Sequence, residues 1–207
     1  MGAFSHWNFR YAHDKLRVVL YGLLNPRAPW FTPDAARFLE GRLEPGWAGL
    51  EWGAGRSTLW LAERVGSLIS VEHDPAWFAR VEGRLRAKGL DNVTLVLKAE
   101  GGPAYAGVAD TVDDGSLDFV LVDGVARLRD VCALAAIAKI RPGGLLIIDD
   151  VHRYLPSASR SPLALPPDAE PLTPGWAEFA EATQDWACEW TSSGVQDTAI
   201  WQRPGAA

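Results

Sequence analysis

The sequence contains only two cysteines, no run of lysine or arginine, and no long apolar segment. Cys132 falls in a helical pattern and Cys188 in a strand pattern, so neither a disulfide framework nor a zinc site is predicted, and both thiols are expected in the core. A net charge of -6 without a basic run offers no footprint for a nucleic-acid backbone or an anionic membrane surface. We therefore expect neither nucleic acid nor a membrane as a partner.

Targeting and membrane-spanning patterns are also missing. No stretch approaches the length of about eighteen apolar residues that a membrane span needs, and the first residues lack the basic-then-apolar order of a secretory signal. We therefore expect a cytoplasmic protein. With 207 residues and 48% apolar content, the chain can bury one core of its own. The sequence predicts a single globular unit, with residues 1–45 as an N-terminal helical cap and residues 46–207 as the main domain.

The first 45 residues predict two helices. Residues 8–24 place apolar and charged side chains at helical spacing, and Asn25-Pro26 ends that pattern. Thr32-Pro33-Asp34 then supplies a helix cap, a first-turn proline and a first-turn acid. An apolar, tryptophan-bearing segment of this kind suits either a cap over a site or an interface between two copies, so a homodimer is one expectation.

From Gly49 onward, short apolar runs alternate with helical patterns. Strands are predicted at 50–52, 67–72, 92–98, 117–123 and 145–149, and helices at 57–65, 75–88 and 127–140. Residues 187–191 and 195–202 predict an antiparallel hairpin, with a helix before it at 176–182. The predicted fold class is therefore α/β: a doubly wound, mostly parallel, seven-stranded sheet with a C-terminal antiparallel hairpin and an N-terminal helical cap.

Prolines and tryptophans mark the segments that can border a site. Pro142-Gly143-Gly144 predicts a turn before the last parallel strand, and residues 156–174, with six prolines, predict an irregular loop directly after that strand. Ligands bind at such strand ends, so this loop is a candidate lid. Of the ten tryptophans, Trp30 and Trp176 lie beside prolines and are expected near a pocket, and the others in the core.

A glycine turn after the first predicted strand is the most informative motif. Gly53-Ala54-Gly55 lets the backbone approach a ligand closely, and Ser57 and Thr58 open the following helix, whose positive end can bind polar groups. Glu51, just before the turn, can face a cationic or amino-bearing ligand group. About twenty residues later, Glu72 ends the next strand, where a carboxylate can accept hydrogen bonds from two ribose hydroxyls. The motif predicts a nucleoside cofactor, with His73 at the edge of its ribose or adenine.

Together these motifs resemble the class I S-adenosylmethionine-dependent methyltransferases. Residues 50–57 are similar to that family's first motif, an acidic residue followed by Gly-x-Gly-x-Gly, although Ser57 stands where the third glycine is commonest. Glu72 matches the acidic ribose-binding residue of the second motif. The resemblance implies that Ala99 and Glu100 lie near the adenine, and that Asp123 faces both cofactor and acceptor.

A narrower resemblance, to metal-dependent small-molecule O-methyltransferases of the catechol type, implies a magnesium site. In that subgroup, carboxylates like Asp123, Asp149 and Asp150 hold Mg²⁺ near the acceptor hydroxyl. This sequence departs from the pattern, because its glycine turn is shorter and Asp150 stands where asparagine is frequent. The alternative is that these aspartates contact the cofactor or cap turns.

Candidate catalytic residues follow the last parallel strand. His152 is the first candidate for a general base, since the unperturbed pKa of histidine lies near neutrality, with Asp150 and Asp123 beside it. Arg127, Arg153 and Tyr154 can orient an acceptor. The alternative is that His152 is a polar loop residue without a catalytic function. Methyl transfer from a sulfonium depends mainly on alignment, and a base is needed only if the acceptor must lose a proton.

Two other functions remain open. A glycine turn and a strand-end acid also serve NAD(P)-dependent oxidoreductases, but a third glycine and a Tyr-x-x-x-Lys set are missing. A cofactor-binding partner protein without catalysis is the other alternative. Among methyl acceptors, the Asp/Asn-Pro-Pro-Tyr/Phe and Pro-Cys motifs of nucleic-acid methyltransferases are absent. The favoured prediction is direct methyl transfer to a hydroxyl of a small molecule.

Overall fold

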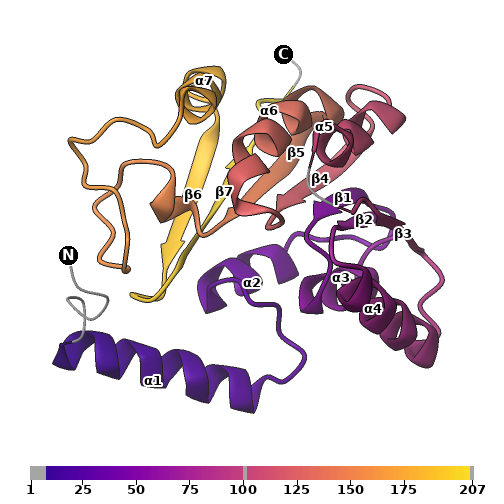
Figure 1. The fold of residues 1–207 in the computed structure, drawn as a ribbon, viewed down its shortest axis with the longest axis horizontal. Helices are drawn as coiled ribbons and strands as arrows, with labels where there is room; N and C mark the ends of the chain where they lie inside the picture. The colour runs from indigo at the N-terminus through magenta and orange to yellow at the C-terminus, as the bar shows by residue number, and fades with distance from the viewer. Residues whose placement is uncertain (1–7, 100–101, 206–207) are drawn as a thin grey trace.

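The computed structural model describes residues 8–99 and 102–205, which form one seven-stranded sheet in the order β3-β2-β1-β4-β5-β7-β6 (Figure 1). The strands are β1 (Ala48–Trp52), β2 (Ser67–Glu72), β3 (Val93–Leu97), β4 (Leu117–Val122), β5 (Ile140–Asp149), β6 (Ala187–Ser192) and β7 (Asp197–Gln202). β1 to β5 run parallel, and β7 pairs antiparallel with both β5 and β6. The predicted fold class is therefore confirmed.

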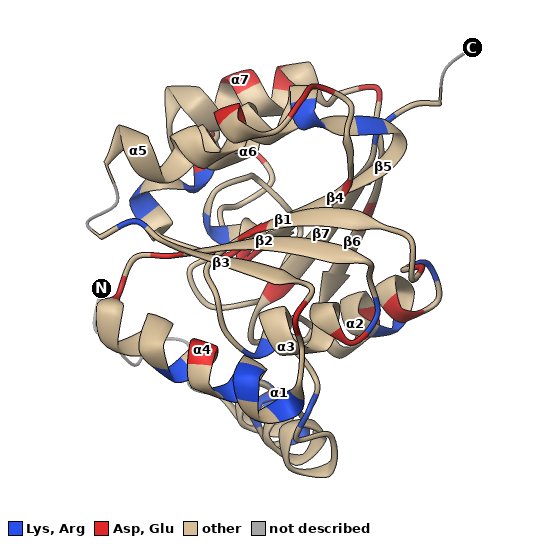
Figure 2. Cartoon of the chain, turned by 90° about the vertical axis from the view of Figure 1, so that its right-hand side faces the viewer, with Lys and Arg blue, Asp and Glu red and all other residues tan. Residues whose placement is uncertain are grey.

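Helices cover both faces of the sheet. One face carries α1 (Phe9–Leu24), α2 (Pro33–Glu40), α3 (Arg56–Ala62) and α4 (Pro75–Lys88). The other carries α5 (Pro103–Ala106), α6 (Arg129–Lys139) and α7 (Pro174–Ala182), as Figure 2 shows. Three short 3₁₀ turns complete the order: η1 (Gly107–Thr111), η2 (Ala126–Leu128) and η3 (Val151–Arg153).

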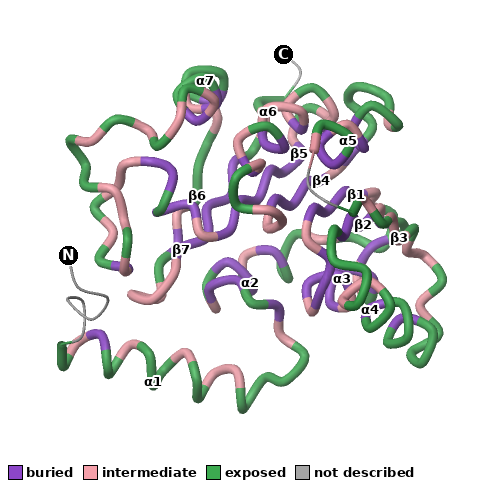
Figure 3. Tube along the Cα trace, in the orientation of Figure 1, coloured by how far each residue is buried: buried purple, intermediate pink, exposed green. Residues whose placement is uncertain are grey.

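The sheet is the centre of the core. Its apolar side chains pack on α6 and α7 on one face and on α2 and α3 on the other. The inner strands are therefore largely buried, whereas the edge strands β3 and β6 and the outer helix surfaces are not (Figure 3). Packing between β1 and β4 is tight, because a Cβ on Gly49 would lie 2.1 Å from Cζ of Phe119. α2 contributes Ala35 and Leu39 to this core, so the predicted cap and the main domain share one apolar interior.

Local sequence signals set the helix ends. Asp74 caps α4, since its Oδ1 accepts hydrogen bonds from the backbone of Ala76 at 2.8 Å and of Trp77 at 2.9 Å, and Pro75 occupies the first turn. Gly89, in the left-handed conformation with φ of 65°, ends the same helix.

Two local predictions are wrong. Pro142-Gly143-Gly144 does not form a turn before a strand but lies within β5, where the register against β4 shifts and Gly143 takes a φ of 79°. Cys132 is buried as expected, whereas Cys188 is exposed on β6, because the edge strand leaves one of its sides uncovered.

α1 lies at the periphery and buries only Tyr11 (Figure 3). Leu16, Leu20 and Leu23 are exposed on it. Among residues 8–99 and 102–205, no helix has both the length and the apolar content to cross a membrane. The homodimer stays a prediction.

Candidate active site

A cavity of about 390 Å³ opens at the carboxyl ends of β1, β2 and β4. β1 and β4 are neighbours in the sheet, but the chain continues from them toward opposite edges. Such a switch point is where open α/β sheets bind ligands. The lining residues are Trp30, Gly53, Ala54, Gly55, Arg56, Ser57, Glu72, His73, Asp74, Trp77, Asp123 and Gly124.

The glycine turn forms one wall of this cavity. Gly53 has a φ of 99°, and a Cβ there would lie 2.8 Å from the backbone of Asp123 and Gly124, so only glycine fits. The Gly55 N–H donates to Oγ1 of Thr58 at 2.8 Å, which fixes the first turn of α3. A ligand in the cavity can therefore approach bare backbone.

Glu51 lies behind the turn rather than on the cavity. It is fully buried, and its carboxylate accepts hydrogen bonds from the hydroxyls of Ser57, Thr58 and Ser70, the last at 2.6 Å. Burial raises its pKa to about 7, although the three hydroxyl donors oppose the rise. Glu51 thus positions Ser57 at the cavity, and its predicted contact with a ligand stays a prediction.

Glu72 presents a pre-oriented carboxylate to the cavity. Its Oε1 accepts from the backbone N–H of His73 at 2.7 Å and of Asp74 at 2.8 Å, and lies 2.9 Å from Nδ1 of His73. Within the described part of the chain, no hydrogen bond is made to its Oε2. One oxygen is therefore anchored while the other remains able to accept from a ligand hydroxyl.

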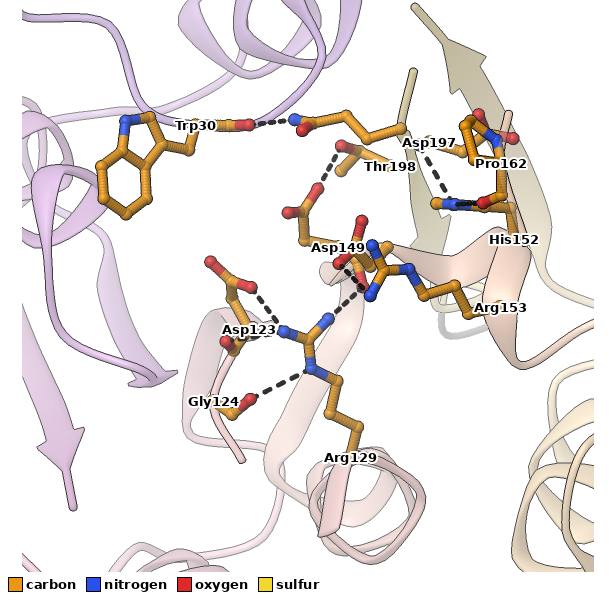
Figure 4. A network of polar contacts seen from close by, with 12 residues as sticks. Trp30, Asp123, Gly124, Arg129, Asp149, His152, Arg153, Pro162, Asp197 and Thr198 are labelled. Carbon is orange, nitrogen blue, oxygen red and sulfur yellow. Dashed lines mark hydrogen bonds and ion pairs between the residues drawn. The ribbon is translucent and has the colours of Figure 1, made fainter. Parts of the chain in front are cut away.

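Two tryptophans form another wall. Trp30, which is 57% exposed, stacks on Trp77 with ring centroids 6.4 Å apart. Nε1 of Trp77 donates to the carbonyl of Ala54 at 2.7 Å, and the carbonyl of Trp30 accepts from Gln196 (Figure 4). Trp30 therefore borders the cavity, as predicted. The same prediction is wrong for Trp176, which is buried in the core and stacks on Tyr154 at 5.0 Å.

Arg129 ties together the ends of β4 and β5, and the sequence reasoning missed it (Figure 4). Its guanidinium donates to a side-chain oxygen of Asp123 at 2.8 Å and to the carbonyls of Asp123, Gly124 and Asp149 at 2.7 to 3.1 Å. Burial raises the pKa of Asp123, while Arg129 opposes that rise. A usable signal was present, because an arginine that opens a helix just after a strand-end aspartate can fold back onto it.

The three aspartates do not fit a magnesium site. Asp123 is paired with Arg129, Asp149 accepts from Oγ1 of Thr198 at 2.6 Å, and Asp150 lies 3.5 Å from Arg153. Guanidinium groups therefore supply positive charge at Asp123 and Asp150, and a hydroxyl is the hydrogen-bond partner of Asp149. Among the residues that the structure describes, no three His, Cys, Asp or Glu side chains are grouped to hold a metal ion. The predicted Mg²⁺ is not supported.

His152 is a buried connection rather than a cavity residue. Its Nδ1 accepts from the backbone N–H of Asp197 at 3.3 Å, and its Nε2 lies 3.2 Å from the carbonyl of Pro162. Burial lowers its pKa. Both ring nitrogens hold the 156–174 loop against β7, and no residue of that loop lines the cavity. The structure therefore places neither His152 nor the predicted lid at the cavity.

The structure brings some predicted residues together and separates others. The predicted residues on the cavity are Gly53, Ala54, Gly55, Ser57, Glu72, His73 and Asp123. Those away from it are Glu51, Thr58, Ala99, Asp149, Asp150 and His152. Glu100 lies outside the described residues. Tyr154 packs in the core, with the Arg129 guanidinium 5.8 Å from its ring centroid.

The mostly parallel seven-stranded sheet with its C-terminal antiparallel pair matches the methyltransferase fold. Residues 50–151 match the family profile of a methyltransferase domain. The resemblance that the sequence motifs indicate is therefore confirmed over these residues. A comparison with curated protein sequences finds no match.

Solved structures share the fold. A proposed O-methyltransferase from Klebsiella pneumoniae superposes with a TM-score of 0.61 at 22% identity, over 95% of this chain and 89% of that one. TomG, an O-methyltransferase from Streptomyces achromogenes involved in tomaymycin synthesis and solved with S-adenosylmethionine, gives 0.58 at 19% identity, over 94% and 80%. A proposed rRNA methylase from Clostridium thermocellum gives 0.60 at 13% identity, over 84% and 96%.

Proposed function

We propose that this methyltransferase transfers the methyl group of S-adenosylmethionine to a hydroxyl of a small molecule. The observation that carries the cofactor assignment is the carboxylate of Glu72, with Oε1 anchored and Oε2 able to accept at the cavity. A ribose diol offers the matching pair of donors. His73, directly beside it, borders the ribose or adenine.

In this proposal, the rest of the cofactor lies between the glycine turn and the two tryptophans. The methionine part is proposed to lie beside Gly53 and Asp123, which both line the cavity, and where a side chain on residue 53 would clash with the backbone of Asp123. Trp30 and Trp77 cover the outer side. They exclude water from the sulfonium, which favours methyl transfer because the transition state has less concentrated charge than the cationic cofactor.

Asp123 is the proposed acceptor-facing group. It lines the cavity at the end of β4, and Arg129 fixes its orientation. In-line transfer needs alignment of the acceptor oxygen with the methyl group, and the Asp123 carboxylate can accept the hydrogen bond or the proton of the attacking hydroxyl. We propose no metal-assisted step, because Arg129 pairs with Asp123, Thr198 donates to Asp149, and Arg153 lies near Asp150.

The acceptor assignment draws on two kinds of support. Two of the superposed structures are described as O-methyltransferases. The cavity is lined by aromatic and acidic side chains, and Arg56 is its only cation among the residues described. Other neighbours are rRNA methylases, so a nucleic-acid acceptor is the outcome that an acceptor screen must be able to detect.

Isothermal titration with S-adenosylhomocysteine and, separately, with NAD⁺ tests the cofactor. Micromolar binding of S-adenosylhomocysteine alone is expected, and binding of NAD⁺ alone would move the chain to the oxidoreductases. A screen of hydroxyl-bearing small molecules and RNA with radiolabelled S-adenosylmethionine then tests the acceptor. Cofactor binding without transfer to any of them would favour the partner protein without catalysis.

A further inference from the structure

A second groove, of about 370 Å³, lies beside the cofactor cavity. It is formed by α3, α4 and the linker after α1. The lining residues are Pro26, Arg27, Arg56, Leu59, Trp60, Glu63, Arg84 and Lys88. Arg56 lines both this groove and the cavity, so the two are neighbours through one side chain.

The groove has more positive than negative charge. Four lining residues are cations, and the one carboxylate is that of Glu63. Glu63 is already engaged, because Lys88 bonds to it and Arg64 lies 3.8 Å from it. Arg64 also pairs with Glu40 at 2.8 Å. The carboxylate of Glu63 therefore does not neutralise the remaining three arginines.

Arg27, Arg56 and Arg84 carry that uncompensated charge. In the described ranges, no carboxylate forms an ion pair with any of them. Arg56 donates to the carbonyls of Asn25, at 3.4 Å, and Pro26, which orient its guanidinium without cancelling the charge. Figure 2 shows blue segments of α4 on the side of the sheet that carries α3 and α1. In a chain of net charge -6, this is a local excess that attracts an anion.

The groove also has an apolar part. Leu59, Trp60 and the ring of Pro26 line it. Trp60 is buried and the Arg64 guanidinium stacks on its ring at 4.1 Å, so Leu59 and Pro26 supply most of the accessible apolar surface. A guanidinium suits a phosphate or carboxylate because its planar fork offers two parallel donors. An apolar surface beside it suits the hydrocarbon or aromatic body of the same ligand.

We infer that this groove binds the anionic group, phosphate or carboxylate, of a small methyl acceptor whose reactive hydroxyl reaches the cofactor cavity past Arg56. The inference rests on the proposed function. The acceptor is then an amphipathic molecule with an anionic end and a hydroxyl. Arg84 on α4 and Arg27 on the linker, which both line the groove, are the proposed partners of the anion.

Phenyl phosphate is a direct probe, titrated calorimetrically at low salt against inorganic phosphate and phenol. Phenyl phosphate is expected to bind most tightly, because it alone offers both the anion and the apolar body. R84Q should weaken it about tenfold, as expected for a lost charge-assisted hydrogen bond. The matched control is R86Q, which removes the same charge from α4 outside the groove, where Arg86 lies 3.3 Å from Glu82. R86Q should change the affinity less than about twofold.

Several results would overturn the inference. Equal binding of phenol, or equal weakening by R84Q and R86Q, would show that the groove does not select an anion. A decauridylate RNA that binds more tightly than phenyl phosphate, with a steep loss of affinity in salt, would assign the cations to a nucleic acid. S-adenosylhomocysteine is titrated separately. Binding of S-adenosylhomocysteine without binding of phenyl phosphate would reject the anion site in the groove but not the proposed function. Binding of phenyl phosphate without binding of S-adenosylhomocysteine would reject the proposed function.

Discussion

The buried carboxyl group of Glu51 makes the folding stability depend on pH. In the folded protein its pKa lies at about 7 rather than 4.5, mainly because burial disfavours the charged form. The folded state therefore holds a proton that the unfolded chain has released over the interval between the two values. The stabilisation from this proton is full below 4.5 and is lost as the pH rises through about 7.

The magnitude follows from the two pKa values. Relative to E51Q, which cannot titrate at this position, the wild-type protein should lose about 2.5 kcal/mol of unfolding free energy between about pH 5 and about pH 8. Urea unfolding of both proteins at several pH values measures this difference. E178Q is the control, since Glu178 is exposed on α7, and its difference from wild type should stay nearly flat. A flat E51Q difference would refute the reasoning, because it would mean that Glu51 is ionised in the fold throughout this range.

Four further predictions concern the cavity and the aspartates at the strand ends. E72A should weaken S-adenosylhomocysteine binding by about 1.5 to 3 kcal/mol in calorimetry through loss of a charged acceptor, whereas E82A on α4 should not, and equal effects would contradict the ribose assignment. R129Q should lower the unfolding free energy, measured by urea unfolding, by about 3 kcal/mol or more, because it leaves Asp123 without its partner. The affinity of the wild-type protein for the cofactor should be the same with Mg²⁺ or with EDTA. An increase in affinity with Mg²⁺ would contradict the charge balance described above. W30A should cost less than about 1 kcal/mol of stability in urea unfolding, since Trp30 is 57% exposed. It should still weaken cofactor binding, and unchanged binding would show that Trp30 is not part of the site.

The fold was largely readable because its signals are local. The ranges predicted for β2 and α4 agree with the structure, since Asp74, Pro75 and Gly89 mark the helix ends chemically. Pro142-Gly143-Gly144 was misread because the same residues that make turns also make irregularities within a strand, and only pairing with β4 and β7 decides between them.

The site was readable only in part, because a sequence shows which residues end a strand but not where their side chains point. The glycine turn, Glu72 and Asp123 reach the cavity as the motifs indicate. His152 does not, because its ring is held between the backbones of Pro162 and Asp197, a contact between segments far apart in the chain. Arg129 was missed although Asp123 lies only six residues before it, because its contact with the carbonyl of Asp149 joins it to a different strand end.

The central claim is that the cavity at the ends of β1, β2 and β4 binds S-adenosylmethionine with its ribose on Glu72. A crystal structure of the protein with S-adenosylhomocysteine tests this most directly. The account predicts density that fills the cavity, with both ribose hydroxyls within hydrogen-bond distance of the Glu72 carboxylate and the sulfur near Asp123. Density elsewhere on the protein, or a ribose that does not contact Glu72, would contradict it.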